Sequence, residues 1–137
     1  MTTRHEHSFG IIPLKKSGDA WNILLVQLHA GHWGFPKGHP NPGETPLETA
    51  QRELFEETGL TVSKQLTDQT AEEVYFFKVQ GDLIHKKVTY YIAQVEGHVK
   101  IMPDEIKAVK WVSLSEAANH VTFDQAKKIC QRVEKLI

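Results

Sequence analysis

Three glutamates in the segment from Pro46 to Thr58 have the type and the spacing to hold a metal ion. Glu56 and Glu57 follow Glu53 by three and four positions, which on a helix places the carboxylates on one contiguous arc. Clustered carboxylates repel one another, and a bound cation lowers that cost most directly. Hard oxygen ligands favour Mg²⁺, with Mn²⁺ as a possible substitute, over zinc. Because Mg²⁺ is usually shared between carboxylates and substrate phosphates, the segment predicts metal-assisted attack of water on a phosphoanhydride.

A helix over about residues 46–58 is expected to carry these glutamates. Pro46 suits a first helical turn, Thr45 can cap it, and Gly59 can end it. An apolar stripe lies beside the acidic arc and is expected to face a core; it consists of Leu47, Ala50 and Leu54. The carboxylates should therefore lie at the border of the buried face.

The wider segment from Gly38 to Leu60 has a fixed pattern around the glutamates. It reads GHPNPGETPLETAQRELFEETGL. Five residues separate Gly38 from Glu44, and seven separate Glu44 from Arg52, which begins the run RELFEETGL. If the glutamates only formed a solvated acidic helix face, Gly38, Glu44, Arg52 and Gly59 would not be needed. The segment resembles the signature box of the Nudix hydrolases at every defining position.

This resemblance implies roles for individual residues. The implied metal ligands are the carbonyl of Gly38 and the carboxylates of Glu53, Glu56, Glu57 and Glu105. Glu105, from outside the box, could instead accept a proton. The general base varies within the family, and Glu56 is favoured here. Arg52 would orient the box carboxylates through Glu56, and Glu44 is expected to brace the loop before the helix rather than to touch substrate.

Residues outside the box resemble one group of the family, the asymmetrical bis(5'-nucleosyl)-tetraphosphatases, or diadenosine tetraphosphate hydrolases. The lead-in to the box, residues 32–39, reads HWGFPKGH as in that group. Lys86, Glu105 and Phe123 are also placed as in that group. The resemblance extends from Phe9 to the last helix. It implies cleavage of diadenosine tetraphosphate to ATP and AMP, by attack of water on a phosphorus away from the midpoint.

The expected phosphate-binding residues are cationic. A tetraphosphate carries several negative charges, so Lys37 and Lys86 are predicted to bind it, and His32 could add a hydrogen bond. The alternative for each lysine is a solvated surface charge, especially within the basic run from His85 to Lys87.

Two aromatic residues are expected to stack on an adenine. Tyr75 and Phe123 look like such a clamp, and stacking contributes roughly 1 to 3 kcal/mol per base. Ordinary core packing is the alternative. The choice of Tyr75 over Phe76 rests on the resemblance, because only alternate residues of a strand face one side. Trp33 could anchor a loop or form a wall of the same pocket.

Two other functions stay open at this point. One is removal of phosphates from RNA 5' ends, or hydrolysis of another nucleoside polyphosphate, against which the net charge of −1 argues mildly. The other is a sensor that binds a nucleotide without hydrolysing it. Such a protein is expected to lack one or more box carboxylates, and none is missing here.

Composition bounds the class of protein. The chain of 137 residues, with 40% hydrophobic and 24% charged residues, is expected to form one Nudix domain over 1–137. Its charge makes a long nucleic acid an unexpected partner, and a monomer is expected. Neither a membrane-length apolar run nor a signal-peptide core is present, so a cytoplasmic location is expected. Cys130 is the only cysteine and is expected in the core.

The apolar pattern predicts the fold. Strands are expected at residues 9–14, 23–28, 73–79, 88–95 and 106–112, and further helices at 115–119 and 123–136. Gly81-Asp82 is the expected hairpin turn, and Ser113 and Thr122 are the expected helix caps. This order is compatible with an α/β/α sandwich with a mixed sheet, which is also the Nudix fold.

Overall fold

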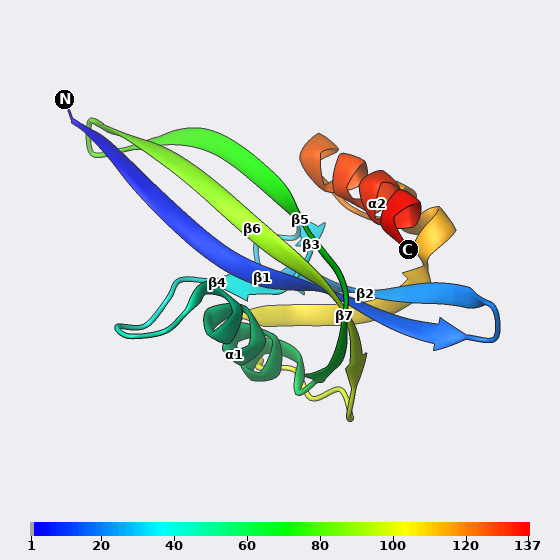
Figure 1. The fold of residues 1–137 in the computed structure, drawn as a ribbon. Coiled ribbons are helices and arrows are strands. Elements are labelled where there is room, and N and C mark those ends of the chain that lie inside the picture. Colours follow the sequence, from blue (N-terminus) through cyan, green and yellow to red (C-terminus); the bar gives the residue numbers. More distant parts are fainter. Residues whose placement is uncertain (1) are drawn as a thin grey trace.

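A mixed sheet forms the middle layer of the protein (Figure 1). The computed structural model describes residues 2–137. The strands are β1 (Thr3–Ser17), β2 (Ala20–Leu28), β3 (Trp33–Gly34), β4 (Lys37–Gly38), β5 (Thr61–Val79), β6 (Asp82–Glu96) and β7 (Ile106–Ser113). Their main order is β3-β2-β1-β6-β5, with β4 paired to β1 and β7 paired to β2. Only β1 and β6 pair in parallel, so β1 connects the two halves of the sheet.

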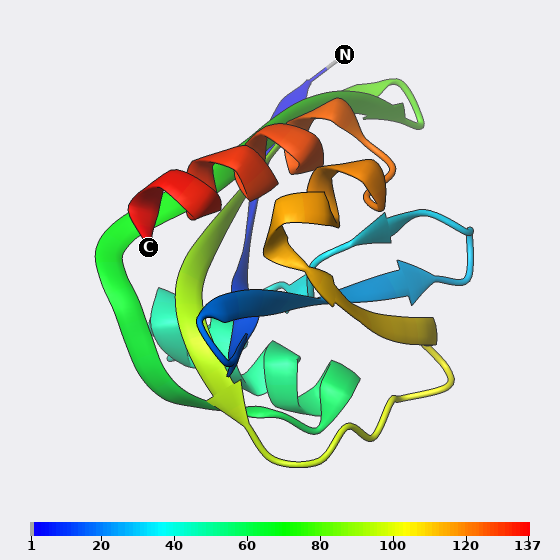
Figure 2. The same cartoon turned by 90° about the vertical axis from the view of Figure 1, so that its right-hand side faces the viewer.

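Helices cover both faces of the sheet. They are α1 (Pro46–Thr58), the 3-10 helix η1 (Leu114–Asn119) and α2 (Asp124–Leu136). Figure 2 shows α2 and η1 on the opposite side of the strands from α1. Successive residues of β1 face opposite sides, so Ile11 is buried with Leu54 of α1, whereas Ile12 is buried with Val133 of α2. The predicted α/β/α sandwich is confirmed.

The bounds predicted for α1 are also confirmed. Thr45 accepts a hydrogen bond from the Glu48 amide at 3.2 Å, and the Glu48 carboxylate accepts one from the Thr45 amide at 2.9 Å. This reciprocal pair satisfies amides that the first helical turn leaves free. Gly59 ends the helix with φ of 80°, a left-handed conformation that favours glycine.

The strands around the predicted hairpin are longer than expected. β5 and β6 pair from Thr61 opposite Glu96 to Val79 opposite Asp82. The turn is therefore Gln80-Gly81, and the predicted Gly81-Asp82 turn is wrong by one residue. Both turn residues have positive φ, 50° and 85°, as a two-residue hairpin turn requires. With β1, the outer halves of these strands project beyond the helices (Figure 1).

Of the two predicted caps, Ser113 occupies the N-cap of η1 but makes no capping bond, and Thr122 is wrong. Ser113 precedes η1 without a capping bond, and its hydroxyl bonds that of Ser115 instead. Phe123, not Thr122, precedes α2. The Thr122 hydroxyl accepts a hydrogen bond from the Trp33 amide at 2.7 Å, so it joins the loop after β2 to the start of α2.

Cys130 is buried in the core under α2, as predicted. Burial raises the pKa of its thiol to about 12, which leaves it a core residue rather than a nucleophile. Within residues 2–137, no helix has the length and hydropathy needed to cross a bilayer.

Candidate functional site

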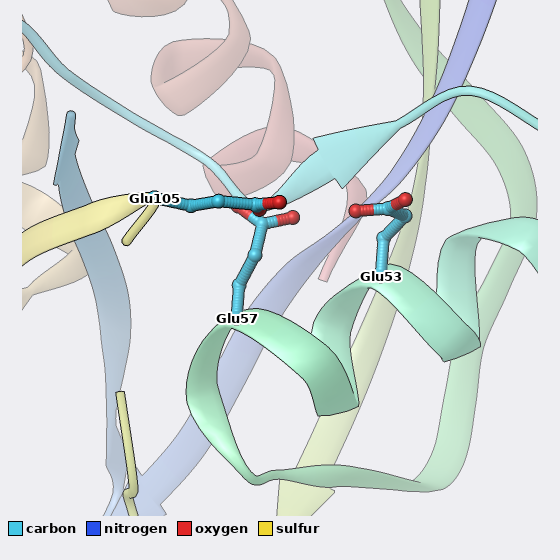
Figure 3. A group of neighbouring side chains, drawn as sticks. All are labelled: Glu53, Glu57 and Glu105. Atoms are coloured by element: carbon cyan, nitrogen blue, oxygen red, sulfur yellow. The ribbon is translucent and has the colours of Figure 1, made fainter. Parts of the chain in front are cut away.

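Three carboxylates converge at the edge of α1 (Figure 3). Glu53 and Glu57 come from α1, and Glu105 immediately precedes β7. One oxygen of each lies within 4.8 Å of the others. Figure 3 shows the three side chains pointing into the same space. Glu53 and Glu57 share a helix face because they are four residues apart, whereas Glu105 is brought in by the fold.

Main-chain hydrogen bonds hold the segment before Glu105 against the end of α1. The Lys100 amide donates to the Thr58 carbonyl at 2.7 Å, and the Met102 amide donates to the Glu57 carbonyl at 3.4 Å. The last carbonyls of a helix lack partners within it, so this segment satisfies them. It also fixes where Glu105 meets the helix.

Glu57 is the buried member of the three carboxylates. Its side chain is 4% exposed, and its Oε2 atom has no hydrogen-bond partner among the described residues. Burial, followed by the neighbouring Glu53 and Glu105, raises the pKa of Glu57 to about 9, against a smaller opposing effect of Lys37. An unpartnered buried carboxylate oxygen that faces two further carboxylates fits a divalent cation. The residues present therefore suit the metal that the sequence predicts.

Arg52 joins the box carboxylates. Its Nη1 atom donates to Glu53 and to Glu56, each at 3.0 Å, while Nη2 donates to the His39 carbonyl at 2.8 Å. The predicted pairing of Arg52 with Glu56 is confirmed. The same guanidinium also bonds Glu44 through Nε at 2.7 Å. A planar guanidinium with five donors suits such a junction, and its position fixes the side of α1 that carries the glutamates.

Glu44 braces the loop before α1, as predicted. In addition to Arg52, its carboxylate accepts bonds from the Asn41 amide at 2.8 Å and from the Thr49 hydroxyl at 3.0 Å. The bonds from Arg52 and Asn41 hold the pKa of Glu44 at about 2. The carboxylate is used by protein donors, so it is a structural member of the box.

Glu56 and Gly38 differ in how they relate to the three carboxylates. The Glu56 side chain is 41% exposed and pairs with Arg52, so the structure does not bring it into the group of Glu53, Glu57 and Glu105. Gly38 lies directly against Glu53, and a Cβ atom at this position would overlap the Glu53 carboxylate. Only glycine leaves room for that side chain.

A cavity of about 600 Å³ lies beside the carboxylates. Its walls are mainly aromatic and aliphatic, with Trp33, Phe35 and Tyr90 among them. Glu57 lines the same cavity, so one residue belongs both to the acidic group and to the cavity. A flat ring bound in the cavity would therefore leave its substituents close to the carboxylates.

The comparisons with known proteins agree with this arrangement. A model of the NUDIX domain matches residues 4–132. The chain belongs to the NUDIX domain family. It is similar to the asymmetrical bis(5'-nucleosyl)-tetraphosphatase of Mus musculus, with 38% identity over 127 residues, covering 88% of this chain and 83% of that protein. It is also similar to an RNA pyrophosphohydrolase of Bartonella clarridgeiae, with 29% identity over 130 residues, covering 78% of this chain and 75% of that protein.

The NUDIX fold is also found by structure comparison. The crystal structure of a C. elegans Ap4A hydrolase binary complex superposes with a TM-score of 0.71 at 23% identity, covering 95% of this chain and 96% of that chain. At this identity the likeness is one of fold. Together with the family match, it confirms the predicted membership.

Most of the substrate-binding residues predicted for this NUDIX domain lie at the cavity. His32, Lys37, Tyr75 and Phe123 all line it. The His32 and Phe123 rings are 5.2 Å apart. Phe76 faces the other side of β5, stacked 4.7 Å from the His85 ring, so Tyr75 lines the cavity and Phe76 does not.

Lys86 lies outside the cavity lining. It is opposite Tyr75 in the β5–β6 pair, and opposite residues in such a pair share a face. Burial lowers the pKa of Lys86, and the nearby Lys37 lowers it further. The two lysines are therefore close enough to affect each other, and Glu6, opposite Lys86 in the β1–β6 pair, partly offsets their effect.

Among the residues of the NUDIX cavity that sequence reasoning missed, two have polar side chains that matter for the site, Glu73 and Gln125. Glu73 is 9% exposed and shares a face of β5 with Tyr75. In the sequence, it could have been found as a charged residue two positions before Tyr75, and therefore on the same face of the predicted strand. Gln125 bonds both polar groups of the Val74 backbone, accepting from the amide at 2.8 Å and donating to the carbonyl at 2.7 Å. No local pattern identifies that pairing across 51 residues.

Trp33, whose place the sequence leaves open, is both an anchor and a wall. Trp33 lines the cavity, and the Lys110 ammonium lies over its ring, 4.3 Å from the centroid. The Trp33 backbone exchanges two hydrogen bonds with Thr122, amide to hydroxyl and carbonyl to amide. The loop after β2 is thereby fixed to the segment that carries Phe123.

Proposed function

We propose that residues 1–137 form one hydrolase domain that cleaves diadenosine tetraphosphate to ATP and AMP. The observation that supports this most directly is the position of Glu57, which lines the aromatic cavity and also belongs to the three-carboxylate group. A base bound in the cavity would leave its phosphates at the carboxylates. The similarity to the mouse tetraphosphatase supports a substrate of this class.

Glu53, Glu57 and Glu105, together with the Gly38 carbonyl, would hold the metal. We assign Mg²⁺, with Mn²⁺ as a substitute, because the donors are hard oxygen atoms. When bound, the cation supplies Lewis-acid polarisation of the phosphoanhydride and neutralises charge on its oxygens. The short reach from Glu57 to Glu53 and Glu105 supports this set of ligands.

The reaction proceeds by attack of water on a phosphorus away from the midpoint of the chain. The water oxygen bonds to phosphorus, the bridging P–O bond breaks, and the departing phosphate takes the bridging oxygen. Glu56 is the proposed general base that receives the proton of the water. Its exposed carboxylate, held by Arg52 at 3.0 Å, lies within reach of solvent.

The remaining contacts orient the substrate. Lys37 and Lys86 would bind phosphate oxygens, and His32 would donate a further hydrogen bond. Tyr75 and Phe123 would stack on the base, contributing roughly 1 to 3 kcal/mol. The placement of His32, Lys37, Tyr75 and Phe123 at the cavity supports these roles. For Lys86 the support is its position opposite Tyr75 in the β5–β6 pair.

Product analysis tests the proposal. Diadenosine tetraphosphate, with Mg²⁺ and separately with chelator, should give ATP plus AMP only when the metal is available. Two ADP would contradict asymmetric cleavage. Triphosphorylated RNA, at matched concentration, serves as the competing substrate because an RNA pyrophosphohydrolase is among the relatives, and a strong preference for it would replace the proposal. Nucleotide binding without any metal-stimulated product would instead indicate a sensor.

The expected cellular context is part of the same proposal. A cytoplasmic monomer that acts on a small dinucleotide rather than on long nucleic acid agrees with the net charge of −1. Sedimentation of the purified chain and fractionation of cells test these two points separately.

A further inference from the structure

The cavity contains one buried carboxylate that the proposed reaction does not use. Glu73 is 9% exposed and lines the cavity. Most of the surrounding wall is apolar, including Val26, Leu28 and Phe35. A carboxylate in such surroundings requires hydrogen-bond donors or an opposite charge. A molecule bound in the cavity is therefore expected to supply hydrogen-bond donors to Glu73.

The protein leaves most of the acceptor capacity of Glu73 unused. Within residues 2–137, no Lys, Arg or His nitrogen lies within ion-pair distance of it. Its neighbour is the buried Tyr90 hydroxyl, whose pKa is raised by burial and then by the Glu73 charge and hydrogen bond. A hydroxyl donates one bond, whereas a carboxylate has about four acceptor positions. Because Glu73 lines the cavity, the remaining positions are available to a molecule bound there.

Glu73 is placed to meet the edge of a stacked base. It precedes Tyr75 by two residues in β5, so both side chains leave the same face of the strand, about 6 to 7 Å apart along it. Both residues line the cavity, so a base stacked on the Tyr75 ring can turn an edge towards the carboxylate. The carboxylate would then read the hydrogen-bonding groups of that edge.

The chemistry of a carboxylate discriminates among purines. It only accepts hydrogen bonds. Guanine presents two adjacent donors, N1–H and the N2 amine, which match two carboxylate oxygens. Adenine presents the N6 amine next to the N1 lone pair, so one bond forms while a lone pair faces an oxygen. Hypoxanthine keeps N1–H but lacks the amine.

We propose that Glu73 is a specificity-determining residue that selects guanine, so that guanine-bearing dinucleoside tetraphosphates are preferred substrates of this site. The inference rests on the proposed function for the reaction, but the recognition of the base does not depend on turnover. It extends the substrate class from the adenine dinucleotide to nucleotides whose base offers paired N–H donors.

Binding of nucleoside diphosphates to the full chain tests the base preference without turnover. Calorimetry with GDP, IDP and ADP should give an affinity for GDP about tenfold or more above that for IDP, because a bond to a charged acceptor is lost. ADP should also bind more weakly than GDP. Equal affinities in the unaltered protein would overturn the inference, and this comparison requires no variant.

Two substitutions localise the effect. Glu73→Gln replaces one acceptor by a donor, so the preference should move from guanine towards adenine, whose edge matches an amide. The matched control is Glu72→Gln, because Glu72 pairs with Lys87 at 3.2 Å on the opposite face of β5 and should leave the GDP-to-ADP ratio unchanged. An unchanged ratio in the Glu73 variant would assign recognition to another residue and overturn the inference.

Turnover separates this inference from the proposed function. If diadenosine and diguanosine tetraphosphate are both cleaved with equal kcat/KM and the diphosphates bind equally, the reaction stands and the role of Glu73 falls. If GDP is preferred but neither dinucleotide is cleaved, the base selection stands and the proposed reaction falls.

Discussion

Replacing Glu57 by Gln should stabilise the metal-free protein at neutral pH while abolishing most turnover. The wild-type side chain is 4% exposed, beside two other carboxylates, and one of its oxygens has no partner among the described residues. Ionising it there is unfavourable without a cation. Gln has the same shape and carries no charge, so it removes this cost together with a metal ligand.

The pH dependence follows from the raised pKa. Burial and the neighbouring carboxylates raise the pKa of Glu57 from 4.5 to about 9. Between these two pH values the folded, metal-free protein keeps the Glu57 proton, whereas the unfolded chain has released it. The free energy of unfolding therefore falls as pH rises. Linkage gives a loss on the order of 1 kcal/mol per pH unit, or about 3 kcal/mol at pH 7. Below about pH 4.5 both states are protonated and the loss disappears.

The assay is urea unfolding in chelator at several pH values between 4.5 and 8.5. Glu57→Gln should match the wild type at the acidic end and exceed it increasingly towards neutral pH. Glu96→Gln, at an exposed position, is the matched control and should follow the wild type. If the stability gap between Glu57→Gln and the wild type does not widen with pH, the assigned burial and charge environment of Glu57 is incorrect.

Three further substitutions test other parts of the site. Gly38→Ala should lower kcat about 100-fold in a folded protein, because its Cβ displaces the Glu53 carboxylate; normal turnover would contradict this packing. Gln125→Ala should raise KM about tenfold with little change in kcat, because it loses both bonds to the Val74 backbone and so no longer holds the adjacent Tyr75 in place. Gln125→Glu, which keeps one bond, should lie between; a loss of stability in both variants without a change in KM would show that Gln125 does not position Tyr75. Thr45→Ala should cost about 1 kcal/mol in urea unfolding through loss of the capping box, and an unchanged midpoint would show the cap to be dispensable.

Local signals explain which parts of the fold could be predicted. Thr45, Pro46 and Gly59 act through their own backbone neighbourhood, so the sequence defines the bounds of α1. The hairpin turn depends on register instead. Pairing of Val79 with Asp82 forces Gln80 to φ of 50°, a conformation that its side chain does not favour. The length of β5 likewise depends on its partner strand, because its polar residues carry no apolar alternation.

In the candidate site too, local spacing predicts some features, whereas others depend on the fold. Spacing along one helix is enough to group Glu53 with Glu57 and Arg52 with Glu56. It is not enough to distinguish Glu56 from Glu57, because adjacent residues differ in burial only once the sheet and Glu105 are in place. The same holds for Glu73. Its charge can be read from the sequence, but the cavity that it lines is formed by elements that are distant in the sequence.

The attachment of the segment before Glu105 has a consequence for how this site can change over time. Lys100 and Met102 hold the end of α1 through their amides alone, and every residue except proline supplies an amide. Side chains here can therefore be exchanged with little effect on the metal ligand. Inserting or deleting one residue would shift Glu105 by about 3 Å, so in this stretch the number of residues is constrained far more strongly than their identity.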